Sequence, residues 1–240
     1  MPEDERPPPA RVLTLLAEGE VEVVGRMPWS SNRTFLVMCT LSGEELAAIY
    51  KPGRGERQLW DFPDGVYQRE AVAYTLSKQL GWDLVPETLV REDGPFGVGS
   101  FQRFVPADFS QHHFTLVEDP AHYDRLKAIC AFDVVANNAD RKSGHCLLGE
   151  DGTIWAIDHG LCFHREPKLR TVIWEFAGEP LPSSLCSGLA DVAEHFAAAV
   201  GDLLAPAEVR ATERRALALL EEGRFPDPDP DRHHYPWPLV

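Results

Sequence analysis

The chain of 240 residues carries a formal net charge of −15, and 44% of its residues are apolar, enough to bury the core of one large or two small lobes. This acidic balance argues against nucleic acids and anionic membranes as partners, because their phosphates attract basic surfaces. No segment approaches the roughly 20 apolar residues of a membrane span, and residues 1–6 lack the pattern of a signal peptide. We therefore expect a cytoplasmic protein without stable membrane insertion.

The first segments predict a tether followed by a β-hairpin. Residues 1–19 contain the run Pro7-Pro8-Pro9, which favours an extended tether. Two apolar runs, at residues 21–24 and 34–37, flank a polar tip. Backbone amides and hydroxyls at this tip are candidates for contacts with phosphate groups, although small polar residues are also ordinary in turns. The tip residues in question are Ser30, Ser31 and Asn32.

The next strand and helix supply a candidate cation and a candidate carboxylate. The run from Leu46 to Lys51 predicts a strand that ends at Pro52, which cannot donate to a central ladder. Residues 66–80 predict a helix, with apolar residues at helical spacing and Gly81 as its stop. Glu70 falls on the inward stripe of this helix, where a carboxylate needs a partner, and Lys51 is the natural one. For an arbitrary Lys and Glu, a surface ion pair is the ordinary interpretation.

The strongest signal lies between residues 138 and 160, after a helix predicted for residues 123–136. Two apolar runs flank Asp151-Gly152, the preferred centre of a two-residue hairpin turn. In that register His145 lies directly opposite Asp158, with Cβ atoms roughly 5 Å apart. Asp140 then stands at the mouth of the same hairpin.

This constellation suits phosphoryl transfer. In that reaction a carboxylate orients the attacking hydroxyl, while further ligands hold a divalent ion that neutralises the phosphates. Asp140 is the candidate for the first role, and His145 and Asp158 are the candidates for the second. A hairpin flanked by polar residues is usually only a hairpin, so this interpretation depends on the remaining segments.

Six segments occur in a consistent order along residues 20 to 180. They are Tyr50-Lys51-Pro52, Arg69-Glu70-Ala71, residues 84–88, residues 99–105, Asn138 to Arg141, and residues 157–161. This order resembles the phosphatidylinositol 3- and 4-kinase superfamily, most closely its type II phosphatidylinositol 4-kinases, and the whole chain resembles an uncharacterised bacterial branch. The resemblance implies an α+β, two-lobed protein-kinase-like fold. Its β-rich N-lobe would span residues 20–105 and its mostly helical C-lobe residues 106–225.

The resemblance also implies the nucleotide site. Lys51 would contact the phosphates of ATP, and Glu70 would pair with it. The hinge beside adenine would lie between residues 102 and 105, with Gln102, Phe104 and Val105 as binding residues.

At the catalytic loop, the resemblance makes Asp140 the catalytic carboxylate and Asp158 a metal ligand, with Arg141 supporting the loop or the transferring phosphate. His145 departs from the family, which has a metal-ligating Asn at this position. Imidazole suits softer ions than an amide oxygen does, so we predict that Mn²⁺ supports activity better than Mg²⁺. His159 is a second departure, and we interpret it as a structural histidine.

The remaining segments are interpreted as structural. Residues 188–204 and 206–222 predict two helices of the C-terminal lobe, the second opened by Pro206 and closed by Gly223. Residues 226–240 are too rich in Pro and Asp to pack on their own, and we expect a flexible or surface-tethered tail. The five cysteines show no paired metal motif, so reduced, buried thiols are expected.

The sequence thus predicts an ATP-dependent phosphotransferase that uses Mg²⁺ or Mn²⁺ and acts on a protein or a small hydroxylated molecule. Lipid is a less favoured acceptor, because the cysteine-rich, lipidated insert of the type II enzymes is missing. One alternative is a pseudokinase that binds nucleotide without turnover. Another is a metal-dependent hydrolase centred on Asp140, His145 and Asp158, which would not need Lys51. Transfer of adenylate instead of phosphate also stays open.

Overall fold

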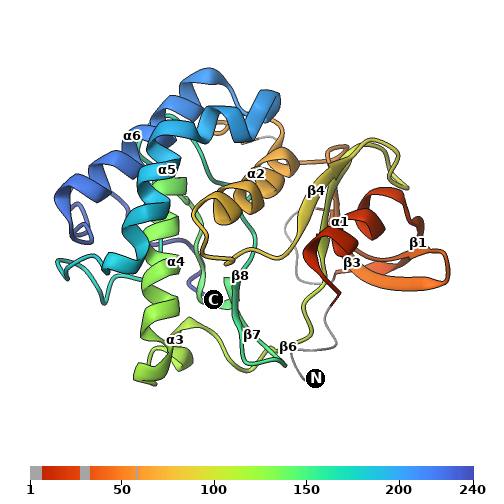
Figure 1. Cartoon of the computed structure of the whole chain (residues 1–240), viewed down its shortest axis with the longest axis horizontal. Coiled ribbons are helices and arrows are strands. Elements are labelled where there is room, and N and C mark those ends of the chain that lie inside the picture. The colour runs from red at the N-terminus through yellow and green to blue at the C-terminus, as the bar shows by residue number, and fades with distance from the viewer. Residues whose placement is uncertain (1–6, 28–32, 58) are drawn as a thin grey trace.

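An antiparallel sheet forms the N-terminal region of the chain, and helices form most of the C-terminal region (Figure 1). The structure is a computed structural model that describes residues 7–27, 33–57 and 59–240. The predicted α+β class is therefore confirmed. Helix α2 (Val66–Gln79), which was predicted for residues 66–80 from their apolar spacing, lies between the two regions.

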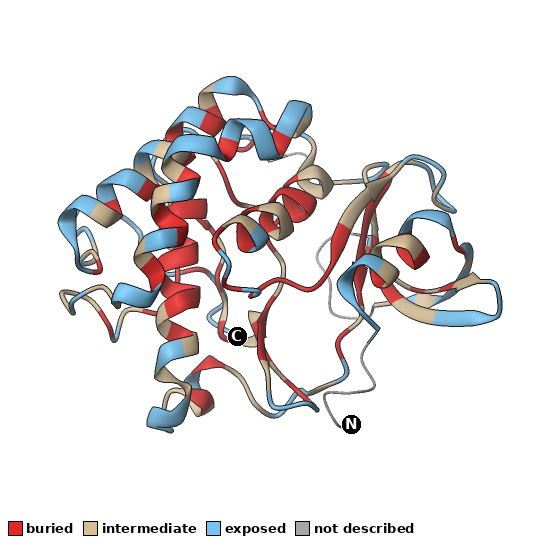
Figure 2. Ribbon diagram, in the orientation of Figure 1, coloured by how far each residue is buried: buried red, intermediate tan, exposed pale blue. Residues whose placement is uncertain are grey.

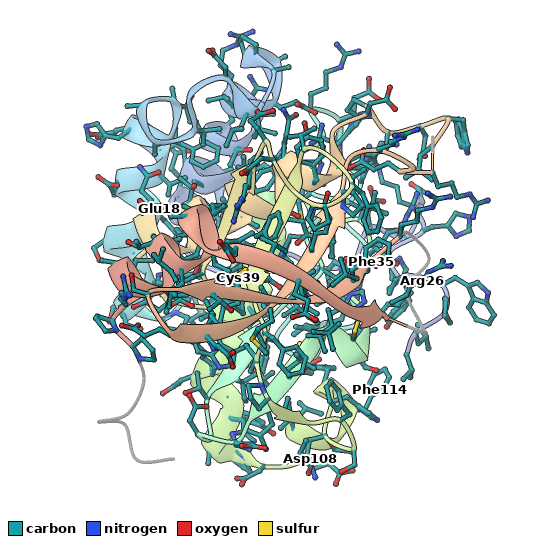
Figure 3. The ribbon with its side chains drawn as sticks, turned by 90° about the vertical axis from the view of Figure 1, so that its right-hand side faces the viewer. Glu18, Arg26, Phe35, Cys39, Asp108 and Phe114 are labelled. Carbon is teal, nitrogen blue, oxygen red and sulfur yellow. The ribbon has the colours of Figure 1, made fainter. Side chains whose placement is uncertain are left out.

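The N-terminal sheet has five antiparallel strands in the order β1-β2-β3-β5-β4. Strands β1 and β2 form a hairpin in which Arg26 is paired with Phe35. Figure 3 shows both side chains at the same end of this hairpin. The predicted phosphate-binding tip, Ser30 to Asn32, lies outside the described residues. The strands are β1 (Glu20–Arg26), β2 (Phe35–Leu41), β3 (Glu44–Pro52), β4 (Thr88–Arg91) and β5 (Gly99–Arg103).

A helix precedes this sheet where a tether was predicted for residues 1–19. Helix α1 (Pro9–Glu18) buries Val12 and Leu16 against the apolar residues of the sheet, and its Leu15 is buried as well. Pro9 takes the first helical position, where its missing N–H is not needed, and the buried residues follow helical spacing. The prolines therefore start a packed helix, and the tether prediction is wrong for residues 9–18.

The C-terminal region is built around α4 (Tyr123–Ala136), whose interior position is visible in Figure 2. Exposed faces are concentrated on α5 (Ser183–Val200) and α6 (Pro206–Glu222). Helix α6 packs on α4, and α5 packs on α6 and α2. Within the described ranges, no helix combines the length and apolar character needed to cross a bilayer. The smaller elements are α3 (His113–Leu116), the 3₁₀ helices η2 (Pro120–His122), η3 (Ser143–His145) and η4 (Gly201–Leu203), and a three-stranded sheet of β6 (Ala107–Asp108), β7 (Cys146–Gly149) and β8 (Ile154–Ala156).

The β7–β8 hairpin forms as predicted, but in another register. Leu147 pairs with Trp155, and three residues close the loop, with Gly152 at a φ of 78°. A three-residue loop with its last residue in the left-handed region is the next commonest hairpin connection after the two-residue turn. The one-residue shift places Ile157, whose N–H donates to the carbonyl of His145, where Asp158 was predicted. The predicted pairing of His145 with Asp158 across the ladder is therefore wrong.

Residues 226–240 run along the C-terminal region and are held by backbone contacts. The N–H groups of Thr171 and Ser143 donate to the carbonyls of His234 and Leu239, at 3.0 and 2.8 Å. The indole N–H of Trp174 donates to the same His234 carbonyl at 3.0 Å. The segment thus reaches the loop that carries Asp140.

The cysteines are free thiols. Cys39, Cys130, Cys146 and Cys162 are buried, and Cys186 is partly exposed. Burial raises the pKa of Cys39 to about 11 and that of Cys146 to about 12, so both are neutral at pH 7. The expected burial is confirmed for four of the five thiols, and Cys186 departs from it.

Helix α5 packs closely on the end of α2, and Gly188 allows this approach. A Cβ atom at Gly188 would lie 2.1 Å from the carbonyl oxygen of Leu80. We expect Gly188→Ala to lower the free energy of unfolding by about 1–3 kcal/mol, because the two backbones must move apart. Urea denaturation measures this, with Gly25→Ala as the control, since a Cβ there meets nothing within 4 Å. Equal midpoints for the two variants would contradict the packing argument.

Candidate active site

Three segments meet at the ammonium group of Lys51, at the end of β3. Its Nζ contacts Oε1 of Glu70 on α2 and donates to Oδ1 of Asp158 at 2.8 Å. The other oxygen of Glu70 accepts from the backbone N–H of His159 at 3.0 Å. The predicted Lys51–Glu70 pair is present, and it also fixes the segment that carries Asp158.

The charges of this cluster stabilise one another. Burial disfavours the charged form of Lys51, but Asp158 and Glu70 outweigh it and raise the Lys51 pKa. Lys51 in turn holds the pKa of Asp158 well below its usual range, so this carboxylate is ionised. Burial raises the pKa of Glu70, and its two hydrogen-bond donors offset part of that effect. At pH 7 the cluster therefore contains a charged ammonium beside an ionised Asp158.

Backbone conformation after β8 brings Asp158 to this position. Asp158 adopts a φ of 59°, in the left-handed region that Asp tolerates better than most residues. Two residues later, a Cβ on Gly160 would lie 2.3 Å from Cγ1 of Val66 in α2. Glycine is thus required where this segment crosses the helix that carries Glu70. In the Asp-His-Gly sequence, Asp158 thus supplies the turn and Gly160 allows the close approach to α2.

His145 lies beside the same carboxylate, with its Nε2 at 3.3 Å from Oδ2 of Asp158. Its Nδ1 is 3.0 Å from the carbonyl of Asp140 and 3.4 Å from the N–H of Lys142. The shorter contact assigns the proton to Nδ1, which donates to the carbonyl. Burial lowers the pKa of His145 to about 4, so the ring is neutral. Its Nε2 lone pair then faces Asp158.

This arrangement suits a shared cation, because a metal-binding imidazole commonly donates its other N–H to a backbone carbonyl. Among the described residues, no three side chains of His, Cys, Asp or Glu gather closely enough to enclose a metal ion. His145 and Asp158 would therefore supply two ligands. A nucleotide and water would supply the others, as is usual for Mg²⁺ beside phosphates.

Asp140 precedes η3 and is paired with a residue that sequence reasoning missed. Its Oδ2 accepts from Nζ of Lys142 at 2.7 Å, and the side chain is 22% exposed. Burial raises the pKa of Asp140, while Lys142 opposes this shift. The spacing of two residues between acid and base was the available signal for Lys142.

Arg141 is part of the scaffold. It is fully buried and forms an ion pair with Asp133 of α4 at 2.9 Å. It also donates to the carbonyls of Ile157 and His145, at 2.8 and 3.2 Å. Of the two predicted roles, support of the loop fits this position, and contact with a transferring phosphate does not.

His159 also lies in the interior, as its interpretation as a structural residue requires. Nη2 of Arg141 donates to Nε2 of His159 at 2.8 Å, and the ring lies edge-on to Phe132. Burial holds the pKa of His159 well below its usual value, so the ring is neutral. Its Nδ1 has no partner among the described residues.

The predicted hinge connects β5 to β6. Gln102 is buried, and its amide donates to Oγ1 of Thr88 at 2.8 Å, so this side chain belongs to the sheet. The N–H of Phe104 donates to the carbonyl of Ala47. Val105 packs with Leu147 and Trp155, and no acceptor within the described ranges takes its N–H. Backbone groups near Val105 are therefore better placed than the Gln102 side chain to contact a base.

No family model matches the chain. A curated relative aligns along nearly its whole length. Protein Rv2133c of Mycobacterium tuberculosis is 42% identical over an alignment of 262 positions, which covers 93% of this chain and 94% of the relative.

Solved structures with similar folds include several kinases. Hydra Fam20, determined with sugar, has a TM-score of 0.57 at 12% identity and aligns over 89% of this chain and 88% of its own. The Golgi casein kinase with Mn/ADP bound has a TM-score of 0.55 at 15% identity, over 97% and 80%. The Helicobacter pylori proinflammatory kinase CtkA has a TM-score of 0.50 at 11% identity, over 88% and 94%. These likenesses establish a kinase-like fold, while membership of the phosphatidylinositol 3- and 4-kinase superfamily stays a resemblance of sequence.

The burial of Arg141 leads to a stability prediction. Arg141→Met leaves Asp133 as an uncompensated buried charge, and we expect a loss of about 3–5 kcal/mol in the free energy of unfolding. Arg141→Lys should also destabilise the fold, because an ammonium cannot reproduce the guanidinium fork. Guanidinium denaturation gives the values, with Arg165→Gln as a control whose side chain is 66% exposed. A loss below 1 kcal/mol for Arg141→Met would contradict a scaffold role.

Proposed function

The chain belongs to the family of protein Rv2133c, and we propose that it is an ATP-dependent, metal-dependent phosphotransferase. Its acceptor would be the hydroxyl group of a protein or of a small molecule. The observation that carries this proposal is the position of Lys51, which joins Glu70 of α2 to Asp158 beside His145. Phosphoryl transfer needs a held cation for the nucleotide phosphates and a carboxylate for the metal ion, and this cluster supplies both.

The metal ion would be Mn²⁺ or Mg²⁺, held by Oδ2 of Asp158 and Nε2 of His145. When bound, it would neutralise the charge that develops on the phosphates during transfer. Neutral His145 can offer its lone pair without first losing a proton. The Golgi casein kinase, which has a similar fold, was solved with Mn/ADP bound. This supports the proposal that the present site also binds a metal ion together with a nucleotide.

Asp140 would orient the acceptor hydroxyl and receive its proton. The hydroxyl oxygen then forms a bond to the γ-phosphorus, the bond to the bridging oxygen breaks, and ADP leaves with the electron pair. Lys142, which holds Oδ2 of Asp140, fixes the carboxylate and adds a positive charge beside it. Adenine would lie against the segment around Val105, whose N–H has no acceptor among the described residues and could donate to the base.

A pseudokinase is the second candidate, and one observation favours it. His145 stands where the resembled family has a metal-ligating Asn, so the site would lack one of that family's oxygen ligands for Mg²⁺. Such a protein would bind nucleotide and leave its phosphates intact.

Incubation of the purified chain with ATP labelled on either the γ- or the α-phosphate tests the proposal. With Mn²⁺ or Mg²⁺ we expect transfer or release of the γ-label, and Asp158→Ala should reduce it roughly hundredfold or more, because metal ligation is removed. Label moved from the α-phosphate instead would mean adenylate transfer. Metal-dependent ATP binding with neither label moved would favour the pseudokinase.

Lys51→Met separates the kinase from the hydrolase alternative. We expect the loss of γ-label transfer to be comparable with that of Asp158→Ala, because the nucleotide phosphates lose their cation. Lys78→Met is the matched control, since Lys78 lies on the surface of α2, the helix that carries Glu70, and pairs with Asp83. A Lys51→Met variant that retains metal-dependent hydrolysis would establish the hydrolase and overturn the proposal.

His145→Asn tests the choice of metal. The parent should be more active with Mn²⁺ than with Mg²⁺, and the variant should narrow this difference, because an amide oxygen prefers the harder ion. Electron paramagnetic resonance of Mn²⁺ with bound ADP gives an independent readout, and weaker Mn²⁺ binding is expected in the variant. Identical Mn²⁺ affinity and an identical activity ratio would contradict ligation by His145.

A further inference from the structure

A short parallel ladder places Arg170 next to the proposed catalytic carboxylate. Arg141 and Thr171 form a parallel β-bridge. The N–H of Arg141 donates to the carbonyl of Arg170 at 3.0 Å, and the carbonyl of Arg141 accepts from the N–H of Val172 at 3.1 Å. The N–H of Arg170 donates to the carbonyl of Asn138 at 2.8 Å. The backbone of Arg170 is thus tied to residues on both sides of Asp140.

Side-chain alternation brings Asp140 and Arg170 to the same face of this ladder. The bridged partners, Arg141 and Thr171, are 0% and 1% exposed and face the interior. Their preceding neighbours, Asp140 and Arg170, are both partly exposed, as the two-residue period of extended chains predicts. Neighbouring extended segments lie about 4.8 Å apart, so the Arg170 side chain starts roughly 5 Å from the Asp140 position.

The guanidinium of Arg170 has no partner among the residues that the structure describes, whereas the cations near it are neutralised. Lys142 pairs with Asp140 at 2.7 Å, and Lys168 pairs with Asp61 at 3.0 Å. Within the described ranges, the Arg170 side chain takes part in no hydrogen bond, ion pair or ring contact. It does lie close enough to Asp61 to help Lys168 lower the pKa of that carboxyl. In a chain with a net charge of −15, a partly buried guanidinium that is unpaired among the described residues, on the ladder face that carries Asp140, is an unused anion-binding group.

We propose that Arg170 binds an anionic group of the phosphate acceptor, a phosphate or a carboxylate close to the hydroxyl that Asp140 orients. This inference rests on the proposed phosphotransferase function and narrows its substrate class. Guanidinium suits this task because its planar fork binds such groups through two hydrogen bonds. The same chemistry is found in a small phosphorylated alcohol and in an acidic peptide with a hydroxyl residue, and the experiment distinguishes the two.

Matched acceptor pairs test the inference on the full chain. One pair is glycerol and glycerol 3-phosphate, and the other is a serine peptide with neutral or with acidic flanking residues. Parent protein should give a kcat/KM at least tenfold higher for the anionic member of one or both pairs. Preference within the first pair alone identifies a small phosphorylated acceptor, and preference within the second alone identifies an acidic peptide.

Arg170→Gln should raise KM for the preferred anionic acceptor roughly tenfold or more, with a smaller effect on kcat, because binding to the acceptor is lost. Arg170→Lys should restore part of the affinity. Arg165→Gln, which removes an exposed cation from the same segment, should behave like the parent. Equal kcat/KM for neutral and anionic acceptors, or a fall in kcat alone for Arg170→Gln, would overturn the inference.

Failure of the proposed function gives a different result. The parent would then transfer no γ-label to any acceptor, and calorimetric titration with inorganic phosphate in the presence of ADP and Mn²⁺ decides the role of Arg170. Weaker phosphate binding by Arg170→Gln than by Arg165→Gln would support an anion site beside Asp140. Equal phosphate binding by the two variants would overturn it.

Discussion

The ammonium of Lys51 is the point at which the N-terminal sheet, α2 and the segment after β8 are joined. Its two carboxylate partners come from different parts of the chain, and one of them, Glu70, also accepts from the backbone of His159. A buried carboxylate is costly unless it is paired and hydrogen-bonded, so these contacts fix the orientation of α2 relative to Asp158. Gly160 is the steric counterpart of this electrostatic link, because any side chain there would push α2 away. Geometry at the candidate active site therefore depends on one ion cluster and one close approach.

A second buried pair supports the other side of the site. Arg141 and Asp133 are both fully buried, and the remaining donors of the guanidinium hold the carbonyls of His145 and Ile157. Removal of two charges from water is compensated only when geometry and additional hydrogen bonds are good, as they are here. The backbone of Arg141 also forms the two hydrogen bonds of the short ladder that positions Arg170. Arg141, placed at the catalytic loop by the sequence, thus holds His145, Ile157 and the Arg170–Val172 segment together from the interior.

Sequence reasoning succeeded where the signal was local and failed where packing decided. The helix with Glu70 and the strand ending at Lys51 were predictable from period and from the flanking Gly and Pro, and their pairing followed from the cost of an inward carboxylate. The hairpin register was missed because Asp-Gly also fits a three-residue loop, although His145 and Asp158 still meet through η3 and the left-handed backbone at Asp158. Burial of Arg141 could not be predicted, because its partner lies eight residues earlier on a helix buried nearly all round. Arg170 carried no local signal at all, since only the fold places it beside Asp140.

Local charge balance links these features to the proposed chemistry. Lys51, Lys142 and Lys168 are each matched by carboxylates, so the site is close to neutral inside a chain with a large negative charge. Asp158 serves in this state as a partner of Lys51, yet the proposed reaction needs the same carboxylate for a divalent ion and the same ammonium for phosphates. Metal ion and nucleotide carry opposite charges. When both bind together, Asp158 can leave Lys51 for the metal ion while Lys51 pairs with the phosphates, so neither side chain is left with an unpaired charge. Neither metal nor nucleotide alone offers this exchange, and we therefore infer that the site favours the metal–nucleotide complex over each component.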